Sequence, residues 1–238
     1  GEGGFTLRLY GTNGHSYGEG YLGIGGNYVK YDYGYENSWH HVCGVFNGKN
    51  FNVYVDGTDD TVGTQTSTFS NSDSELGIGY RDTEYSDSSK AHFQGEIDEV
   101  RIYNRSLTPS EVQSLYSTSQ QGSITTKWGP SGSVKPQLTE SDWSQPDAPE
   151  SSNLGGAWRL NEDYGFSSSG DTVKDWSGNR NDGTTNGGIT THVDGAFDGS
   201  TAYHFDGSDD YVDYGDSIVD TSQAFTAALW VKVDSSNS

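Results

Sequence analysis

Short runs of alternating hydrophobic and polar residues dominate the first half of the chain. Residues 5–10 read FTLRLY, residues 76–82 read LGIGYRD and residues 95–104 read GEIDEVRIYN. Alternation with a period of two is the pattern of a β-strand that buries one face. We therefore predict a succession of short strands over this part of the chain.

A hairpin is predicted in the middle of these strands. The runs WHHVCGVF (39–46) and FNVYVDG (51–57) flank Asn47-Gly48, and an Asn-Gly pair between strands favours a tight turn. Adjacent residues of a strand face opposite sides, so His40 and His41 are not expected to share a metal ion. We expect Trp39 in the core and one of the two histidines at the surface.

One short helix is predicted after the last of these strands. Thr108 is a good N-cap, Pro109 suits the first helical position, and Glu111 completes a capping box. Val112 and Leu115, with Tyr116 beside them, form an apolar stripe. The stripe predicts a helix that packs against the outside of a sheet.

The chain divides into three parts. Residues 1–118 contain the strands and the helix described above. Residues 119–153 are rich in Ser, Thr, Gln and Pro, without periodicity, and read as an extended, partly polyproline-like linker. Strand patterns resume in residues 154–238, ending with AFTAALWVKVD (224–234).

Charge narrows the classes of partner. The chain has 34 acidic and 13 basic residues, a formal net charge of −21. Nucleic acid and anionic membranes require a basic face, so both are excluded as expected partners. An acidic surface keeps a protein soluble in concentrated salt, and the longest apolar run (224–231) is too short to span a bilayer. The composition favours a salt-adapted, secreted β-protein. Because the chain has no methionine, we expect a processed product or a segment of a longer protein.

Several stretches resemble one known family, the laminin-G-like branch of the concanavalin A-like lectin/glucanase superfamily. They are SWHHVCGVFNGKNFNVYVDG (38–57), GEIDEVRIYNRSLTPSEVQSLY (95–116), AWRLNE (157–162), DWSGNRNDG (175–183), AYHFDGSDDYVDYG (202–215) and FTAALWVKVD (225–234). The resemblance implies an all-β, two-sheet antiparallel jelly roll with one short helix. It also implies an extracellular protein that functions in adhesion, glycan binding or protein binding, commonly stabilised by calcium.

The order of these stretches departs from the family. There, AWRLNE opens the domain and IDEVRIYNRSL closes it, whereas here residues 1–118 supply the closing half and residues 154–238 the opening half. The jelly roll is therefore expected to be circularly permuted or strand-exchanged. The two halves can fold together in one chain, or each chain can complete its neighbour head to tail and form a fibre. A window across two tandem domains is the third possibility. In a fibre, the strand of residues 224–234 is the assembly edge.

The carboxylates of Glu96, Asp98 and Glu99 are the first candidates for chemistry. Family 16 glycoside hydrolases of the same superfamily carry Glu-x-Asp-x-Glu on one strand, but here Val100 occupies the third position and Glu99 points the other way. We therefore expect no enzyme. Asp98 shares its predicted face with Val100 and Ile102, so it needs a partner in the core.

The resemblance makes structural Ca²⁺ a plausible partner for these carboxylates. We expect ligands from Asp98, Asp206 and Asp209, since calcium binds several oxygen atoms in irregular loops. A turn with solvated charges explains Asp206, Asp209 and Asp210 equally well. The loop of residues 175–183 lacks a full calcium pattern, and we expect side-chain-to-backbone turn bonds there.

Tyrosines and one sequon complete the candidate sites. Tyr17, Tyr21, Tyr31 and Tyr33 belong to a tyrosine-rich segment that suits sugar binding or an interface, although some of these rings are expected between sheets. Asn104-Arg105-Ser106 is a possible N-glycosylation site.

The leading hypothesis is a non-enzymatic extracellular structural or adhesive subunit on the surface of a salt-loving microbe. It would assemble head to tail with other copies into a filament or array. The alternative is a carbohydrate-binding module of a secreted protein, with glycans as its partners.

Overall fold

The structure is a computed structural model that describes most of the strands and one helix. The described residues are 5–9, 19–24, 27–32, 37–61, 76–81, 91–120, 153–162, 169–197, 199–215, 218, 220 and 222–234. For β1 to β3 and for residues 80, 81, 91 and 118–120 the description is limited to the backbone. The expected linker (119–153) lies almost wholly outside these residues. In chain order the elements are β1 (Phe5–Leu9), β2 (Glu19–Ile24), β3 (Asn27–Asp32), β4 (His40–Phe46), β5 (Phe51–Val55), β6 (Thr58–Asp59), β7 (Gly77–Ile78), β8 (Tyr80–Arg81), β9 (Ala91–His92), β10 (Gln94–Tyr103), α1 (Pro109–Gln120), β11 (Leu154–Trp158), β12 (Thr172–Val173), β13 (Gly183–Asn186), β14 (Thr190–Asp194), β15 (Thr201–Asp206), β16 (Tyr211–Asp213) and β17 (Phe225–Val233).

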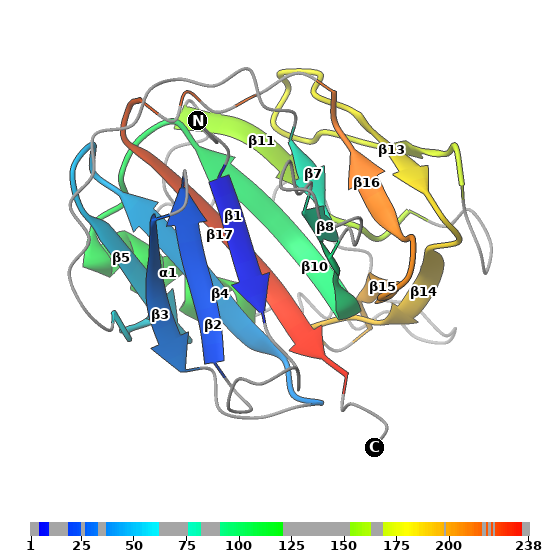
Figure 1. Cartoon of the computed structure of the whole chain (residues 1–238), viewed down its shortest axis with the longest axis horizontal. Coiled ribbons are helices and arrows are strands. Elements are labelled where there is room, and N and C mark those ends of the chain that lie inside the picture. The colour runs from blue at the N-terminus through cyan, green and yellow to red at the C-terminus, as the bar shows by residue number, and fades with distance from the viewer. Residues whose placement is uncertain are drawn as a thin grey trace, which may run out of the picture.

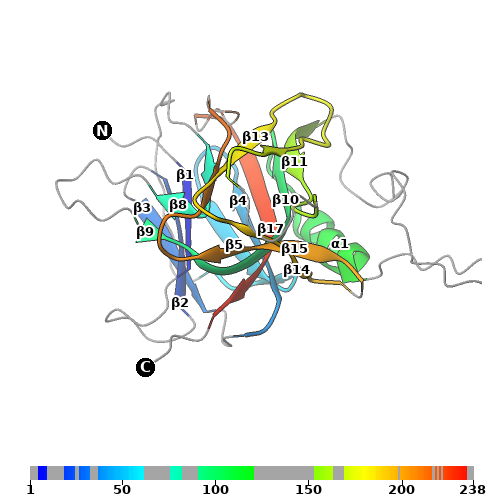
Figure 2. The same ribbon diagram turned by 90° about the vertical axis from the view of Figure 1, so that its right-hand side faces the viewer.

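The largest sheet has eight strands in the order β14-β15-β10-β17-β4-β5-β6, with β11 also paired to β10. A four-stranded sheet has the order β12-β13-β16-β7, and smaller sheets are formed by β1-β2-β3 and by β8-β9. Figure 2 shows α1 on one side of the eight-stranded sheet and β1 to β3 on the other. The strand pairs given for the described residues are antiparallel. The predicted all-β sandwich with one short helix is confirmed.

The two parts of the chain interleave within one sheet. From the first part, β10 pairs with β11, β15 and β17 of the second part, and β4 pairs with the other edge of β17. In Figure 1 the red β17 lies between the green β10 and the blue β4. In this structure of one chain, the two halves pair with each other within a single sheet. In this arrangement β17 is a central strand and has no free edge.

The two faces of the eight-stranded sheet are distinguished by their side chains. On β4, Val42 and Phe46 point to one face, and Cys43 and Val45 point to the other. We call the first the inner face, because its cluster also includes Val212 and other residues of the four-stranded sheet. This separation follows from the period of two along a strand. The inner face is the core of the sandwich.

Helix α1 covers part of the other face, which we call the outer face. Val112 and Leu115 are buried there against Cys43, Tyr54 and Tyr103. The predicted packing of the helix is confirmed.

The start of α1 has the predicted capping box. The Thr108 N–H donates to Glu111 Oε2 at 2.8 Å, and the Glu111 N–H donates to Thr108 Oγ1 at 3.3 Å. Arg105 adds a second bond to this carboxylate, with 2.6 Å between Nη2 and Oε1. The cap thus fixes where the chain turns from β10 into the helix.

A bulge in β10 changes which residues face the core. The register against β17 shifts between Asp98 and Arg101, and Glu99 has a φ of 50°. Ile97 and Val100 therefore both reach the inner core, whereas Asp98 lies opposite Trp230 on the outer face. The expectation that Asp98 shares a face with Val100 and Ile102 was wrong, because a bulge adds one residue and reverses the alternation beyond it.

The predicted hairpin is confirmed at residues 46–51. β4 and β5 pair from Phe46↔Phe51 onward, and Asn47 Oδ1 accepts the N–H groups of Lys49 and Asn50. Trp39 precedes this hairpin and is only partly buried, outside both apolar clusters. The prediction of a core Trp39 was therefore wrong; instead, the Lys232 ammonium lies 5.6 Å from the centre of its ring.

Candidate functional site

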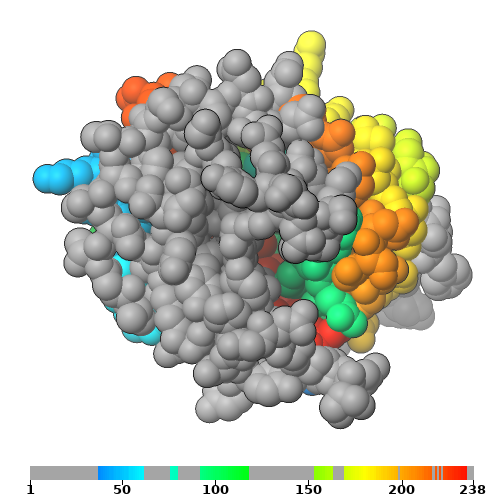
Figure 3. All heavy atoms as spheres, viewed as in Figure 1, coloured from blue at the N-terminus to red at the C-terminus, as the bar shows by residue number. Residues whose placement is uncertain are grey.

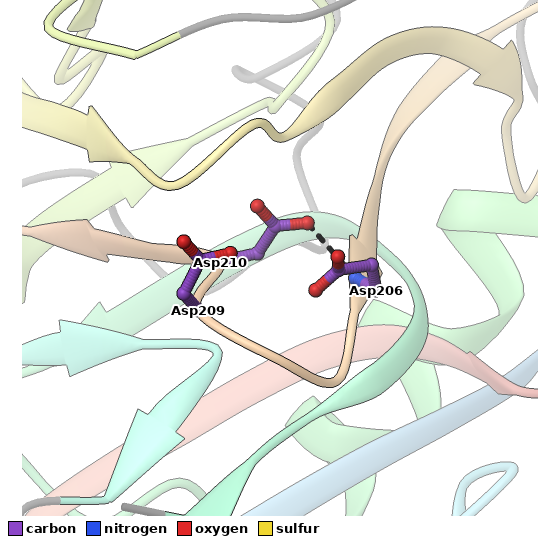
Figure 4. A group of neighbouring side chains, drawn as sticks. All are labelled: Asp206, Asp209 and Asp210. Atoms are coloured by element: carbon purple, nitrogen blue, oxygen red, sulfur yellow. Dashed lines mark hydrogen bonds between the residues drawn. The ribbon is translucent and has the colours of Figure 1, made fainter.

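The turn between β15 and β16 brings three carboxylates together. Asp206 ends β15, Asp210 precedes β16, and Gly207 between them has a φ of 79°. One oxygen from each of Asp206, Asp209 and Asp210 lies within 4.8 Å of the others, and Figure 4 shows the three side chains around the turn. In Figure 3 this orange segment is at the surface, beside the green β10.

Asp210 holds this turn by hydrogen bonds to two separate segments. Its side chain is buried, with Oδ1 accepting the Gly188 N–H at 2.6 Å and Oδ2 accepting the Asp206 N–H at 2.9 Å. The Asp206 Oδ1 in turn accepts the Ser208 N–H at 2.7 Å. These bonds are those of the turn interpretation.

The same three residues also have the chemistry of a cation site. Carboxylate oxygens are the ligands that Ca²⁺ prefers, and Asp206 and Asp209 are exposed to solvent. Each oxygen of Asp210 that accepts one N–H still has a second lone pair. The donor set therefore fits a hard divalent cation, with other ligands from water or backbone.

Asp98 does not belong to this group of carboxylates. It is 1% exposed, and its Oδ2 accepts the Ala196 N–H at 3.0 Å. Burial, together with the charge of Glu99, raises the pKa of Asp98 well above its usual value. Of the predicted metal ligands, the structure brings Asp206 and Asp209 together, with Asp210 in the place expected for Asp98.

The sequence did carry a signal for Asp210. Asp206, Asp209 and Asp210 stand within five residues between two alternating runs, so one turn has to hold all three. Asp98 instead depended on a strand face that the bulge reversed.

The carboxylates of β10 are each paired separately. Glu96 Oε1 lies 2.9 Å from Lys232 Nζ, and Glu99 Oε2 lies 3.0 Å from Arg101 Nη2. Asp98 is bonded to a backbone amide, as described above. The three acidic groups therefore have three different partners and do not converge on one substrate position.

The loop of residues 175–183 is held by the predicted side-chain-to-backbone bonds. Asp175 Oδ1 accepts the N–H groups of Ala157 and Ser177, and its Oδ2 accepts the Asn181 N–H. Asn179 Nδ2 donates to the carbonyl of Leu154 at 2.6 Å. This loop ties itself to β11, and the turn-bond prediction is confirmed.

The two neighbouring histidines take different environments. His40 Nδ1 lies 2.8 Å from Asp56 Oδ2, whereas His41 is buried on the outer face beside the rings of Tyr116 and Trp230. Burial, with the nearby charge of Arg101, lowers the pKa of His41 to about 3. His41 is thus a neutral packing residue at physiological pH. No local pattern in the sequence indicates this buried aromatic group, because its three rings come from distant segments.

The tyrosine candidates fall mostly outside the description. Tyr17 and Tyr33 lie outside the described residues, and Tyr21 in β2 and Tyr31 in β3 are placed by their backbone alone. The ladder pairs Tyr21 with Lys30 and Tyr31 with Gly20.

The glycosylation candidate is described in full. Asn104 is exposed in the bend after β10, and its backbone N–H donates to the Asn153 carbonyl at 2.9 Å.

Comparison with known proteins gives one match. Residues 1–113 match a laminin-G-type family model, described as concanavalin A-like lectin/glucanases superfamily. Searches of curated proteins and of solved structures found no significant match. Within the described residues, no helix is long and apolar enough to cross a membrane. The family match does not reach residues 154–238, so the permuted order remains a prediction. Residues 1–113, just under half of the chain, are thus similar to the concanavalin A-like lectin/glucanase superfamily.

Proposed function

We propose that this protein is a non-enzymatic, extracellular module with a lectin-like or adhesive role. The observation that carries the proposal is the match of residues 1–113 to the concanavalin A-like superfamily, in a chain whose strands form the expected sandwich. Because that superfamily includes both lectins and glucanases, the carboxylates decide between binding and hydrolysis.

Hydrolysis of a glycosidic bond by two carboxylates requires both groups on opposite sides of one bond. On β10, Glu96 is paired with Lys232 and Glu99 with Arg101, while Asp98 is buried and accepts the Ala196 N–H. This arrangement supports binding without hydrolysis.

The test of this function is binding measured together with hydrolysis. Immobilised glycans and extracellular-matrix proteins are probed with the purified chain at high salt, and released reducing ends are measured on the same polysaccharides. We expect retention on a glycan or protein surface and no release of sugar. Release of reducing ends would contradict the proposal, as would a failure to bind any surface.

The tyrosine-rich segment is the ligand surface that we propose for this module. Tyr17, Tyr21, Tyr31 and Tyr33 would supply rings on which sugar faces stack. Replacing each by Ala should weaken glycan retention, whereas Phe should preserve it, because stacking needs the ring and not the hydroxyl. Equal losses with Phe and Ala would remove the stacking role.

We also propose that Asp206, Asp209 and Asp210 hold a structural Ca²⁺. A bound ion would neutralise three neighbouring carboxylates and hold the β15–β16 turn. Added Ca²⁺ should therefore raise Tm, and a chelator should lower it. Asp209→Asn should abolish this response, whereas Asp220→Asn, an exposed turn residue elsewhere, should retain it. A response unchanged in Asp209→Asn would place the ion elsewhere.

Self-assembly is the second candidate, favoured by the way in which the two parts of the chain meet. Every contact between β10 or β4 and β17 could equally form between two chains, because only the connection differs. Head-to-tail exchange would then build a surface filament. Light scattering at high salt and rising concentration tests this, and a monodisperse monomer throughout would exclude it.

The net charge of −21 supports a salty environment. Repulsion between acidic groups destabilises the compact state and is screened by salt. Tm should rise steadily between low salt and molar NaCl, and a salt-independent Tm would contradict this adaptation.

A further inference from the structure

We infer that the space between β4 and β10, which we call the β17 slot, is the surface through which two copies of this chain exchange. Its occupant in the exchanged state is β17 of a second copy. This inference rests on the self-assembly proposed above and assigns its contact surface.

The β17 slot is lined on both sides by the other part of the chain. Ladder pairs run from Phe225↔Phe46 to Val231↔His40 on one side, and from Tyr103↔Thr226 to Gly95↔Val233 on the other. Neither neighbour of β17 therefore lies close to it in sequence. An unfilled slot would present two strand edges and two apolar faces to solvent, which is the kind of surface that recruits another strand.

The occupant of the slot must be apolar on both faces. Phe225 and Val231 enter the inner core, while Ala228 lies in the outer cluster and Trp230 stacks on Tyr116 at 5.8 Å between ring centroids. An ordinary amphipathic strand would leave one of these faces unfilled. A strand with the sequence of β17 meets this requirement, whether it comes from the same chain or from a second copy.

Two polar side chains fix the register of that strand. At one end Thr226 Oγ1 donates to the Arg105 carbonyl at 2.9 Å and accepts the Leu107 N–H at 3.0 Å. At the other end Lys232 Nζ lies 2.9 Å from Glu96 Oε1. A strand shifted by one residue would bury both groups without these partners, which is costly.

The connection between α1 and β11 decides whether β17 comes from the same chain. Leu107, just before α1, is bonded to Thr226 of β17, and Tyr116 of α1 stacks on Trp230 of β17. Thr226 and Trp230 are four strand residues apart, so this part of α1 runs about 13 Å along the sheet. Asn153 lies back beside Asn104. Thirty-two residues connect Gln120 to Asn153 in sequence, and a segment of that length can span this distance within one chain.

A single disulfide can report where β17 sits. Cys43 and Ala228 are directly opposite in the β4–β17 ladder and both are buried, and opposite residues of antiparallel strands are within disulfide range. Ala228→Cys should therefore form an intrachain bond. Because burial raises the pKa of Cys43, the bond must form during refolding in a glutathione buffer, before the slot closes.

The exchange itself is tested with two chains that can bond only to each other in this register. Wild type supplies Cys43, and the double variant Cys43→Ala/Ala228→Cys supplies the opposite thiol. After refolding the mixture, a disulfide-linked peptide pair, identified by mass as Cys43 of one chain joined to position 228 of the other, shows β17 of one copy in the slot of the other. Ala227→Cys in place of Ala228→Cys is the control, because residue 227 points to the inner face.

Shortening the connection should drive the exchange. Deleting residues 121–150 leaves two residues, which span at most about 11 Å, less than the return requires. The interchain product should then rise by about tenfold or more over the full-length chain at equal micromolar concentration, since a connection that cannot span the sites loses its advantage.

Each outcome decides the inference. An interchain bond between Cys43 and position 228 that grows with concentration and with shortening supports the slot. Its absence at every concentration, while Ala228→Cys alone forms the intrachain bond, overturns it. Interchain bonds found only in closed dimers would support the exchange of β17 between copies but contradict the open filament.

Discussion

The two faces of the eight-stranded sheet are both buried, but by different means. The inner face meets other strands, and its cluster is made of apolar and aromatic side chains from both sheets. The outer face has a smaller apolar cluster under α1, and it also buries His41, Asp98 and Glu96. Among the described residues, His41 Nδ1 and Trp230 Nε1 are buried on the outer face without a hydrogen-bond partner, and the inner cluster has one such group, the Tyr214 hydroxyl.

This contrast indicates where stability and adaptability are located. An apolar face packed against a second sheet tolerates few changes, because each lost atom leaves a cavity. A face with buried charges and buried polar groups that lack hydrogen bonds contributes less to the free energy of unfolding per unit of buried area. The outer face should therefore respond to pH and to helix variants more than the inner face does.

The largest effect is expected for Trp158→Ala on the inner face. Trp158 is fully buried, its ring centre lies 4.4 Å from that of Tyr214, and Nε1 donates to the Asn181 carbonyl at 2.9 Å. Losing the ring should lower the free energy of unfolding by about 3–5 kcal/mol, measured by urea denaturation. Trp176→Ala, on a half-buried tryptophan, is the matched control and should cost less. Equal losses would mean that burial in the inner core does not set the cost of losing a tryptophan ring.

The next effect is expected under the helix. Leu115 is 1% exposed in the outer cluster, so Leu115→Ala should cost about 2–3 kcal/mol. Gln113→Ala, on the exposed side of α1, should change the free energy of unfolding by less than about 0.5 kcal/mol. A loss for Leu115→Ala as large as that for Trp158→Ala would remove the contrast between the faces.

Much of this fold could be predicted because its signals are local. Asn47-Gly48 and the Thr108–Glu111 capping box act within a few residues, so sequence alone located the hairpin and the helix. The inner and outer residues of β4 and β17 follow from simple alternation. None of these features depends on a distant part of the chain.

The misplaced residues depend on distant contacts. The bulge at Glu99 adjusts β10 between β11, β15 and β17, and no turn residue marks it in sequence. For the same reason Asp98 was assigned to the wrong face, while Asp206 and Asp209, close together in one turn, were correctly expected to lie together. Trp39 was also misplaced, and the ammonium group near its ring belongs to Lys232, far along the chain.

The pH response of the outer face can be tested at Asp98. Because burial raises its folded pKa above the usual 3.8, the carboxyl contributes stability at low pH and loses that contribution as pH rises through the folded pKa. Asp98→Asn keeps an acceptor for the Ala196 N–H and cannot ionise. Its urea midpoint should therefore fall less than that of wild type between pH 4 and pH 8.

Asp56 provides the control of opposite sign. Burial alone would raise the pKa of Asp56, but hydrogen bonds from His40 and the His41 backbone outweigh it and lower the pKa. Its contribution is present above the usual value of 3.8 and is lost as the pH falls below it. Asp56→Asn should therefore lower stability above the usual value of 3.8 and approach wild type as the pH falls below it. If both variants lost stability relative to wild type at neutral pH, burial of Asp98 would not be the cause of its pH response.

The smallest effect is expected at the cap of α1. Thr108→Ala removes the hydroxyl that accepts the Glu111 N–H, at a cost of about 1 kcal/mol.

The hydrogen bonds from Arg105 lower the pKa of Glu111 to about 2, so Glu111→Gln should lose stability above pH 4.5 and approach wild type as the pH falls toward 2. Ser110→Ala, on an exposed first-turn residue, is the control for helix propensity. Thermal unfolding at about pH 7 and about pH 2.5 measures all three, and a Thr108→Ala loss no greater than that of Ser110→Ala would show that the helix is held by the sheet alone.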